Sequence, residues 1–224
     1  MVLRGKIIAY GAPMGAFIGL LALNPLLPLL GRPFWLQHPE YWVFPLQTVI
    51  CGAVLCRFWP AYELDPAKRL TTGITVGLLV FGLWISPQTL FGFPPRIDGF
   101  NPEVFAAQPV LYWSTVALRF LRLVVVVPLV EEIFWRGFLL RYLINEKFDQ
   151  VPFGTFSWVS FLVVTCAFGF SHSKPDWPAA LATGALYNWV AYRTKSLTTC
   201  VVTHALTNLL LGIWIMSTRQ WGFW

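Results

Sequence analysis

The chain has 224 residues, of which 57% are hydrophobic and only 12% charged. This composition is typical of a polytopic membrane protein and excludes an ordinary soluble domain. The formal net charge of +6 is spread over short loops without a Lys/Arg block, which excludes a nucleic-acid-binding stripe and suits membrane orientation better.

Apolar runs follow one another along the whole chain, and each run of about 20 residues can cross a ~30 Å hydrocarbon core as a helix. The sequence therefore predicts an all-α, polytopic transmembrane bundle of about eight helices, with seven possible, as a single domain over residues 1–224. Pro45 is expected to interrupt the second helix. The expected helices are Ile7–Leu30, Tyr41–Trp59, Leu70–Phe91, Val110–Val127, Leu129–Lys147, Phe156–His172, Trp177–Tyr192 and Leu197–Met216.

The run Val110–Lys147 is treated as two units because as one helix it would measure about 57 Å. Pro128 lies at its middle and can break it. If Val110–Val127 crosses the membrane there are eight crossings; if it lies on the surface there are seven. The distribution of Lys and Arg between the two sides favours seven.

Two adjacent carboxylates and an arginine follow an apolar stretch, at Glu131, Glu132 and Arg136. An ionised carboxylate is costly to bury in hydrocarbon, so such a pair needs compensation or a function. On a helix Glu132 and Arg136 stand i,i+4 and can pair, whereas Glu131 points about 100° away. We expect Glu132 and Arg136 to orient a site in which Glu131 works. The alternative is a buried ion-pair cluster that only orders helix packing.

Two histidines also lie in apolar segments. His172 ends an apolar helix four residues after Phe168, and His204 lies four residues before Asn208 on the same helix face. Each alone is more typical of a hydrogen-bonded packing residue. Together with Glu131 they offer a base, two imidazoles and an amide on three helices, which suits activating water and stabilising an oxyanion.

Three motifs occur in order: Glu-Glu-x3-Arg at 131–136, Phe-x3-His at 168–172 and His-x3-Asn at 204–208. This pattern resembles the CAAX protease and bacteriocin-processing family of intramembrane endopeptidases, which includes the type II CAAX prenyl endopeptidase. The resemblance covers residues 125–216, the expected catalytic core. Val-Pro-Phe-Gly-Thr-Phe at 151–156 and Gln-Trp-Gly-Phe-Trp at 220–224 resemble a narrower, CAAX prenyl protease-related branch associated with exosortase loci. That branch implies a bacterial inner-membrane protein.

The resemblance implies a role for each motif residue. Glu131 would activate the attacking water, His172 would share its proton network, and His204 and Asn208 would stabilise the oxyanion. Glu132 and Arg136 would orient the site. The expected substrate-binding residues are Phe134, Trp135 and Phe168, of which the first two are bulky enough to narrow the site.

Members of this family have been discussed both as metalloproteases and as metal-free glutamate proteases. Glu131, His172 and His204 could ligate Zn²⁺ and leave one position open. We favour a site without a cofactor, because Asn208 and the second carboxylate suit an oxyanion site.

The expected activity is hydrolysis of a peptide bond in a membrane-associated protein or peptide, with the lipid bilayer as the other partner and no nucleic acid. A non-catalytic immunity or scaffold protein of the same family is the alternative, and the intact motif set counts against it. A transporter is disfavoured because no inverted repeat is visible. The resemblance favours eight crossings with the site toward the cytoplasm, and it does not imply a prenylated substrate.

Overall fold

The computed structural model describes residues 3–224, and throughout that range the regular elements are helical. Within residues 3–224 there are eight helices, counted with the four-residue α2, so the predicted all-α bundle of about eight helices is confirmed. They are α1 (Leu3–Leu21), α2 (Phe34–Gln37), α3 (Glu40–Phe58), α4 (Leu70–Leu90), one long helix comprising α5 to α7 (Pro109–Tyr142), α8 (Trp158–Phe170), α9 (Trp177–Thr194) and α10 (Leu197–Thr218).

Four of these described helices are long and apolar enough to cross a membrane. The shorter α8 is apolar as well. Together with the composition, these helices make the chain an integral membrane protein. The four are Glu40–Ala61, Leu70–Leu90, Pro109–Tyr142 and Leu197–Thr218.

The break predicted at Pro128 is wrong, because the two expected units form one continuous helix. A proline in an α-helix removes one hydrogen bond and clashes with the carbonyl four residues earlier. Here a π-helical segment, Arg122–Val126, comes directly before it and provides a wider turn. In the i→i+5 register Pro128 would be the donor to the Leu123 carbonyl, which instead accepts a hydrogen bond from the Asn208 amide at 2.8 Å. The helix continues because its neighbour supplies the missing donor.

Two other boundaries differ from the sequence prediction. Pro45 does not interrupt α3, because it stands in the second turn, where the ring removes one hydrogen bond near the helix start. The first helix ends at Leu21 rather than Leu30, ahead of Pro25, and the chain continues through a turn into a 3₁₀ segment at Leu27–Leu30.

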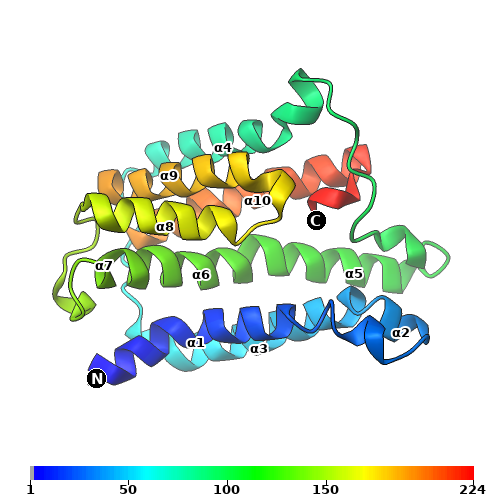
Figure 1. Cartoon of the computed structure of the whole chain (residues 1–224), viewed down its shortest axis with the longest axis horizontal. Helices are drawn as coiled ribbons and strands as arrows, with labels where there is room; N and C mark the ends of the chain where they lie inside the picture. Colours follow the sequence, from blue (N-terminus) through cyan, green and yellow to red (C-terminus); the bar gives the residue numbers. More distant parts are fainter. Residues whose placement is uncertain (1–2) are drawn as a thin grey trace.

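Figure 1 shows the helices side by side, with α1 and α3 on one side of the long helix and α8, α9, α10 and α4 on the other. Neighbouring helices pack directly against each other: α1 on α3, α8 on α9, and α4 on α10. The connections alternate between two ends of the bundle. One end carries the 59–69 loop, the 143–157 connection and the 195–196 turn. The other end carries residues 22–39, 91–108, 171–176 and 219–224.

The two ends of the bundle differ in their number of basic residues. We name the end with the 59–69 loop the basic end and the other the opposite end. Arg119, Arg122 and Arg136 belong to neither end, because they lie within the long helix. The basic end carries Arg4, Lys6, Arg57, Lys68, Arg69, Arg141, Lys147, Arg193 and Lys195. The opposite end carries Arg32, Arg96, Lys174 and Arg219.

The core surrounds the long helix, where Val130 and Ile133 are fully buried. Glycines bring the surrounding helices close together. A Cβ on Gly73 of α4 would lie 2.6 Å from the Thr203 hydroxyl of α10, and one on Gly184 of α9 would lie 3.1 Å from a backbone oxygen of α8. Larger residues would force these pairs apart. The small residues therefore fix the helices that carry the motif histidines.

The basic end is tied together by two ion pairs. Arg141, at the end of the long helix, donates to Glu63 of the 59–69 loop at 2.8 Å. Lys6 of α1 donates to Asp149 at 3.0 Å, and this hydrogen bond holds the pKa of the Asp149 carboxyl below its ordinary value. Both pairs link a helix end to a connection distant in the sequence.

Candidate active site

Glu132 is the centre of a buried ionic cluster. Its Oε1 accepts from Nη1 of Arg136 at 3.0 Å and from Nδ1 of His204 at 2.9 Å. Glu132 and Arg136 are both 0% exposed. Burying two charges is unfavourable unless they are paired and hydrogen-bonded, and here both conditions hold for the shared oxygen. The i,i+4 pairing expected from the sequence is therefore present, and it extends to the last transmembrane helix.

Arg136 connects this cluster to α9. Its Nε donates to the Asn188 side chain at 3.1 Å, and its Nη2 donates to the Gly184 carbonyl at 3.3 Å. The guanidinium also lies over the rings of Phe168 and Tyr187, at 4.8 and 5.4 Å from their centroids. A planar group with several fixed donors suits such multiple bonding. Arg136 thus joins three helices around the site.

Glu131 lies outside this cluster and faces a cavity of about 340 Å³. Within residues 3–224 its carboxylate has no hydrogen bond or ion pair. The long helix contributes a stripe of cavity-lining residues at helical spacing, namely Arg119, Arg122, Leu123, Val127 and Glu131. The carboxylate is therefore available to a bound molecule.

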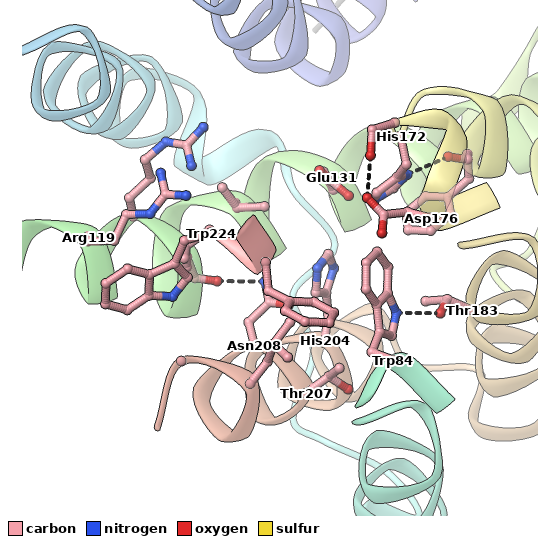
Figure 2. Close-up of a pocket in the computed structure, with 18 of the residues that line it drawn as sticks. Trp84, Arg119, Glu131, His172, Asp176, Thr183, His204, Thr207, Asn208 and Trp224 are labelled. Carbon is pink, nitrogen blue, oxygen red and sulfur yellow. Dashed lines mark hydrogen bonds between the residues drawn. The ribbon is translucent and has the colours of Figure 1, made fainter. Parts of the chain in front are cut away.

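The remaining walls come from elements far apart in the sequence. Figure 2 shows Glu131, His172, His204 and Asn208 among the side chains around this cavity. The other lining residues include Phe17, Trp84, Arg96, Phe168, Ser173, Asp176, Thr183, Tyr187, Thr207, Leu211 and residues 222–224. All four residues expected to be catalytic thus line one cavity.

His172 follows the end of α8, half-buried at the cavity wall. Its Nδ1 donates to the Phe168 carbonyl at 2.8 Å. That bond assigns the proton of the neutral ring to Nδ1, so Nε2 keeps its lone pair. The ring lies against Phe168 and Trp84, with centroid distances of 4.9 and 5.7 Å. The Phe-x3-His spacing therefore positions the ring and sets its tautomer.

His204 is held by its bond to Glu132, which uses Nδ1. A carboxylate on one ring nitrogen fixes the ring orientation and stabilises the positive charge that forms when the other nitrogen binds a proton. Tyr187 packs on the ring at a centroid distance of 5.3 Å and donates to Thr207 at 2.8 Å. Within the described chain Nε2 of His204 has no partner.

Asn208 has a structural bond of its own. One of its N–H groups donates to the Leu123 carbonyl in the π-helical segment. The other N–H is left for a second acceptor. Asn208 thus lines the cavity and also completes the hydrogen bonding of the long helix.

Comparison with protein families addresses the segment that carries these residues. Residues 113–210 match the family model described as type II CAAX prenyl endopeptidase Rce1-like. The match covers less than half of the chain, so it shows what this segment is similar to. The matched segment includes all three motifs and the arginines at 119 and 122. Comparisons with curated proteins and with solved structures find no match.

The side chains around the cavity do not form a metal-binding set in the part of the chain that the structure describes. Within residues 3–224 no three His, Cys, Asp or Glu side chains lie close enough together to hold a metal ion. Zn²⁺ needs ligands at about 2.0–2.3 Å in a tetrahedral arrangement. Glu131, His172 and His204 as they stand therefore do not fit Zn²⁺, and we derive no step through a metal.

The expected substrate-binding aromatics separate into two groups. Phe168 lines the cavity, but Phe134 and Trp135 are not among its lining residues. Trp135 instead packs edge-on against Phe168 and Phe134, at 6.1 and 4.9 Å between centroids. Phe134 and Trp135 therefore lie outside this cavity, and their expected role in binding substrate stays a prediction. The cavity extends from Glu131 toward the N-terminal end of the long helix, and these two residues lie one turn the other way.

Sequence reasoning missed several residues around this site. Asn188 and Tyr187 on α9 carried a usable signal, because polar groups within an apolar helix need partners. Trp84 on α4, which donates to Thr183 at 3.0 Å, lies outside the motif region and carried none. Arg96 in the 91–108 loop pairs with Asp176 at the opposite end, and only the fold brings them together.

Proposed function

We propose that this chain is an intramembrane endopeptidase that hydrolyses a peptide bond in a membrane-associated protein or peptide. The similarity of residues 113–210 to the Rce1-like family supports CAAX protease activity in general. The observation that carries the proposal is Glu131, a carboxylate without a protein partner on a cavity that also contains two imidazoles and an amide.

Glu131 is the proposed general base. It takes a proton from water while the water oxygen bonds to the substrate carbonyl carbon. It then returns that proton to the amide nitrogen as the C–N bond breaks, so one carboxylate serves both steps. His172 supports this transfer, because its Nε2 lone pair can accept a hydrogen bond from the same water.

His204 and Asn208 are the proposed oxyanion donors. His204 donates from Nε2 only when the ring is positively charged, and Glu132 on Nδ1 stabilises that charge. Asn208 donates through the N–H that Leu123 does not use. Donors fixed in position, away from bulk water, are worth more than in solution. Glu132 and Arg136 act by holding His204 in place.

The test is substrate trapping. Membranes expressing wild-type protein or Glu131→Gln would be compared by quantitative proteomics, with Glu146→Gln as the matched control because Glu146 is exposed in a loop. We expect membrane proteins or peptides that accumulate uncleaved, and co-purify, only with Glu131→Gln. Identical cleavage by wild type and Glu131→Gln would refute the proposed role of Glu131.

The competing function is a non-catalytic scaffold or immunity protein. It is favoured by the structural use of two motif residues, since Glu132 and Asn208 both satisfy buried groups. Under that function, wild type and Glu131→Gln would bind the same partners and neither would release a cleaved product. The proteomic comparison therefore separates the two.

A further inference from the structure

Two arginines outside the three motifs lie buried in the wall of the cavity. Arg119 is 4% and Arg122 is 5% exposed, on adjacent turns of the long helix. Within residues 3–224 neither forms an ion pair with a carboxylate, unlike Arg136 and Arg141. Buried charges in membrane helices are costly and mark binding sites or ion pathways. These two cations therefore need an explanation.

The surroundings compensate the two charges only in part. Arg122 donates from Nε to the Gln47 side chain at 2.7 Å and lies over the Phe44 ring at 4.4 Å. Arg119 lies over the rings of Phe44, Phe100 and Trp224. Its Nε and Nη1 are buried without any hydrogen-bond partner in the described chain. Ring faces attract a cation but cannot accept the directed bonds that a guanidinium donates.

The cavity itself has an excess of positive charge on this side. Among the described residues, two carboxylate side chains line it, Glu131 and Asp176, and Asp176 is already paired with Arg96. Figure 2 shows Arg119 beside Trp224 at the side of the cavity away from His172. An arginine fork matches the two oxygens of a carboxylate. We propose that Arg119 and Arg122 bind a carboxylate of the peptide substrate, an inference that rests on the proposed endopeptidase function.

The helix fixes how far this carboxylate lies from the scissile bond. Arg122 stands nine positions and Arg119 twelve positions before Glu131, which at 1.5 Å per residue separates their Cα atoms from that of Glu131 by roughly 13 and 18 Å along the helix axis. An extended peptide covers roughly 3.3–3.6 Å per residue. The bound carboxylate is therefore about four to five residues from the bond that is cut. It is either the C-terminal carboxylate of the substrate or an Asp or Glu side chain, and the two sources are separable.

The experiment uses apolar peptides of degenerate sequence, prepared in three forms. One has free C-terminal carboxylates, one has C-terminal amides, and one has amides with a single Glu at each position in turn. Purified protein in phosphatidylcholine nanodiscs cleaves them, and mass spectrometry gives rates and cut positions. We expect at least tenfold faster cleavage of a carboxylate-bearing form, with cuts clustered about four to five residues from that carboxylate. A preference for the first form identifies the terminal carboxylate, and a preference for the third identifies a side chain.

Arginine variants assign the preference to the site. Arg119→Met and Arg122→Met should each bring the carboxylate-to-amide rate ratio toward one, chiefly through KM, and Arg119→Lys should keep part of it. The control is Arg219→Met, because that guanidinium is 72% exposed and pairs with Glu103 at the surface; its ratio should equal that of wild type. Arg119→Met should not melt below wild type, because it removes a charge that is unpaired in the free protein. If it melts lower, or if wild type cleaves acids and amides equally, the inference fails.

Binding to the inactive protein separates this inference from the proposed function. Fluorescent acid and amide peptides would be titrated against Glu131→Gln protein, and the acid should bind at least tenfold more tightly. If wild type cleaves no peptide but the acid still binds more tightly than the amide, the proposed endopeptidase function is rejected and the carboxylate site is retained. Loss of the preference when phosphatidylglycerol replaces phosphatidylcholine would show that an anionic lipid headgroup occupies the arginines, and would overturn the inference.

Discussion

Removing one charge of the Glu132–Arg136 pair should cost far more stability than removing Glu131. Both members are fully buried, and Glu132 also accepts from His204. Breaking a buried pair by truncating one partner costs roughly 3–5 kcal/mol, because the other charge stays buried without compensation. For a chain of this size about 1 kcal/mol corresponds to ~2–4 °C in Tm, so Glu132→Ala and Arg136→Ala should each melt roughly 6–20 °C lower.

Thermal unfolding in detergent, followed by far-ultraviolet circular dichroism, measures this difference. Glu131→Gln is the control, because its half-buried carboxylate has no partner within residues 3–224; its Tm should stay within about 2 °C of wild type. The double variant Glu132→Gln/Arg136→Met should lose less than the sum of the single losses, because no unpaired charge remains. Equal melting of Glu131→Gln, Glu132→Ala and Arg136→Ala would refute the division between an orienting pair and a working carboxylate.

Three further outcomes follow from the same geometry. Asn208→Ala should leave residual proteolysis, lowered about 10²–10³-fold by loss of one oxyanion donor. The same variant should also lower Tm, because the Leu123 carbonyl loses its hydrogen-bond donor. An unchanged Tm would contradict the role of Asn208 in completing the long helix. Proteolysis should survive prolonged chelation, and metal analysis of the active protein should find Zn²⁺ well below one equivalent; stoichiometric metal lost together with activity would reverse this. By the positive-inside rule the basic end should be cytoplasmic. Thiol labelling of single-cysteine variants should therefore reach position 146 from the cytoplasm and position 101 from the other side. The reverse labelling would contradict this orientation.

The topology prediction differs from the family-based expectation. His172, Asp176 and Arg96, which line the cavity, come from connections at the opposite end of the bundle. If the basic end is cytoplasmic, the cavity faces away from the cytoplasm. The family resemblance implies a site toward the cytoplasm, so the labelling experiment decides between two definite outcomes.

Most of the fold was predictable because the sequence repeats one simple signal. Long apolar runs separated by polar turns predict helices, and the bounds of α4, α9 and α10 differ from the predictions by at most two residues at either end. The long helix was not predictable by the same rule. Pro128 reads locally as a break, and only a contact from α10, more than 80 residues later in the chain, replaces its missing donor. A local rule fails when a distant side chain completes the backbone.

The site was predictable to the extent that its polar side chains are energetically costly to bury in lipid. Glu131, Glu132, Arg136 and the histidines stand out because hydrocarbon does not tolerate unpartnered polar groups. Their mutual arrangement was less accessible, since the bond between His204 and Glu132 depends on how α10 packs on the long helix. The direction of the cavity along that helix could not be predicted from the sequence, so the absence of Phe134 and Trp135 from its lining could not be predicted either.

The length of the helix Pro109–Tyr142 makes bilayer thickness a variable of the proposed proteolysis. Its 34 residues rise by about 51 Å, whereas the hydrocarbon core measures about 30 Å. A tilt of more than about 50° would be needed to fit it entirely, beyond the ~40° seen for membrane helices, so the helix must project or the lipid must thicken around it. Glu131 moves with the helix, and thin or thick membranes should shift its depth and its supply of water. Proteolysis in bilayers of increasing acyl-chain length should therefore pass through a maximum, and a rate independent of chain length would show that the surrounding helices fix the depth of the site.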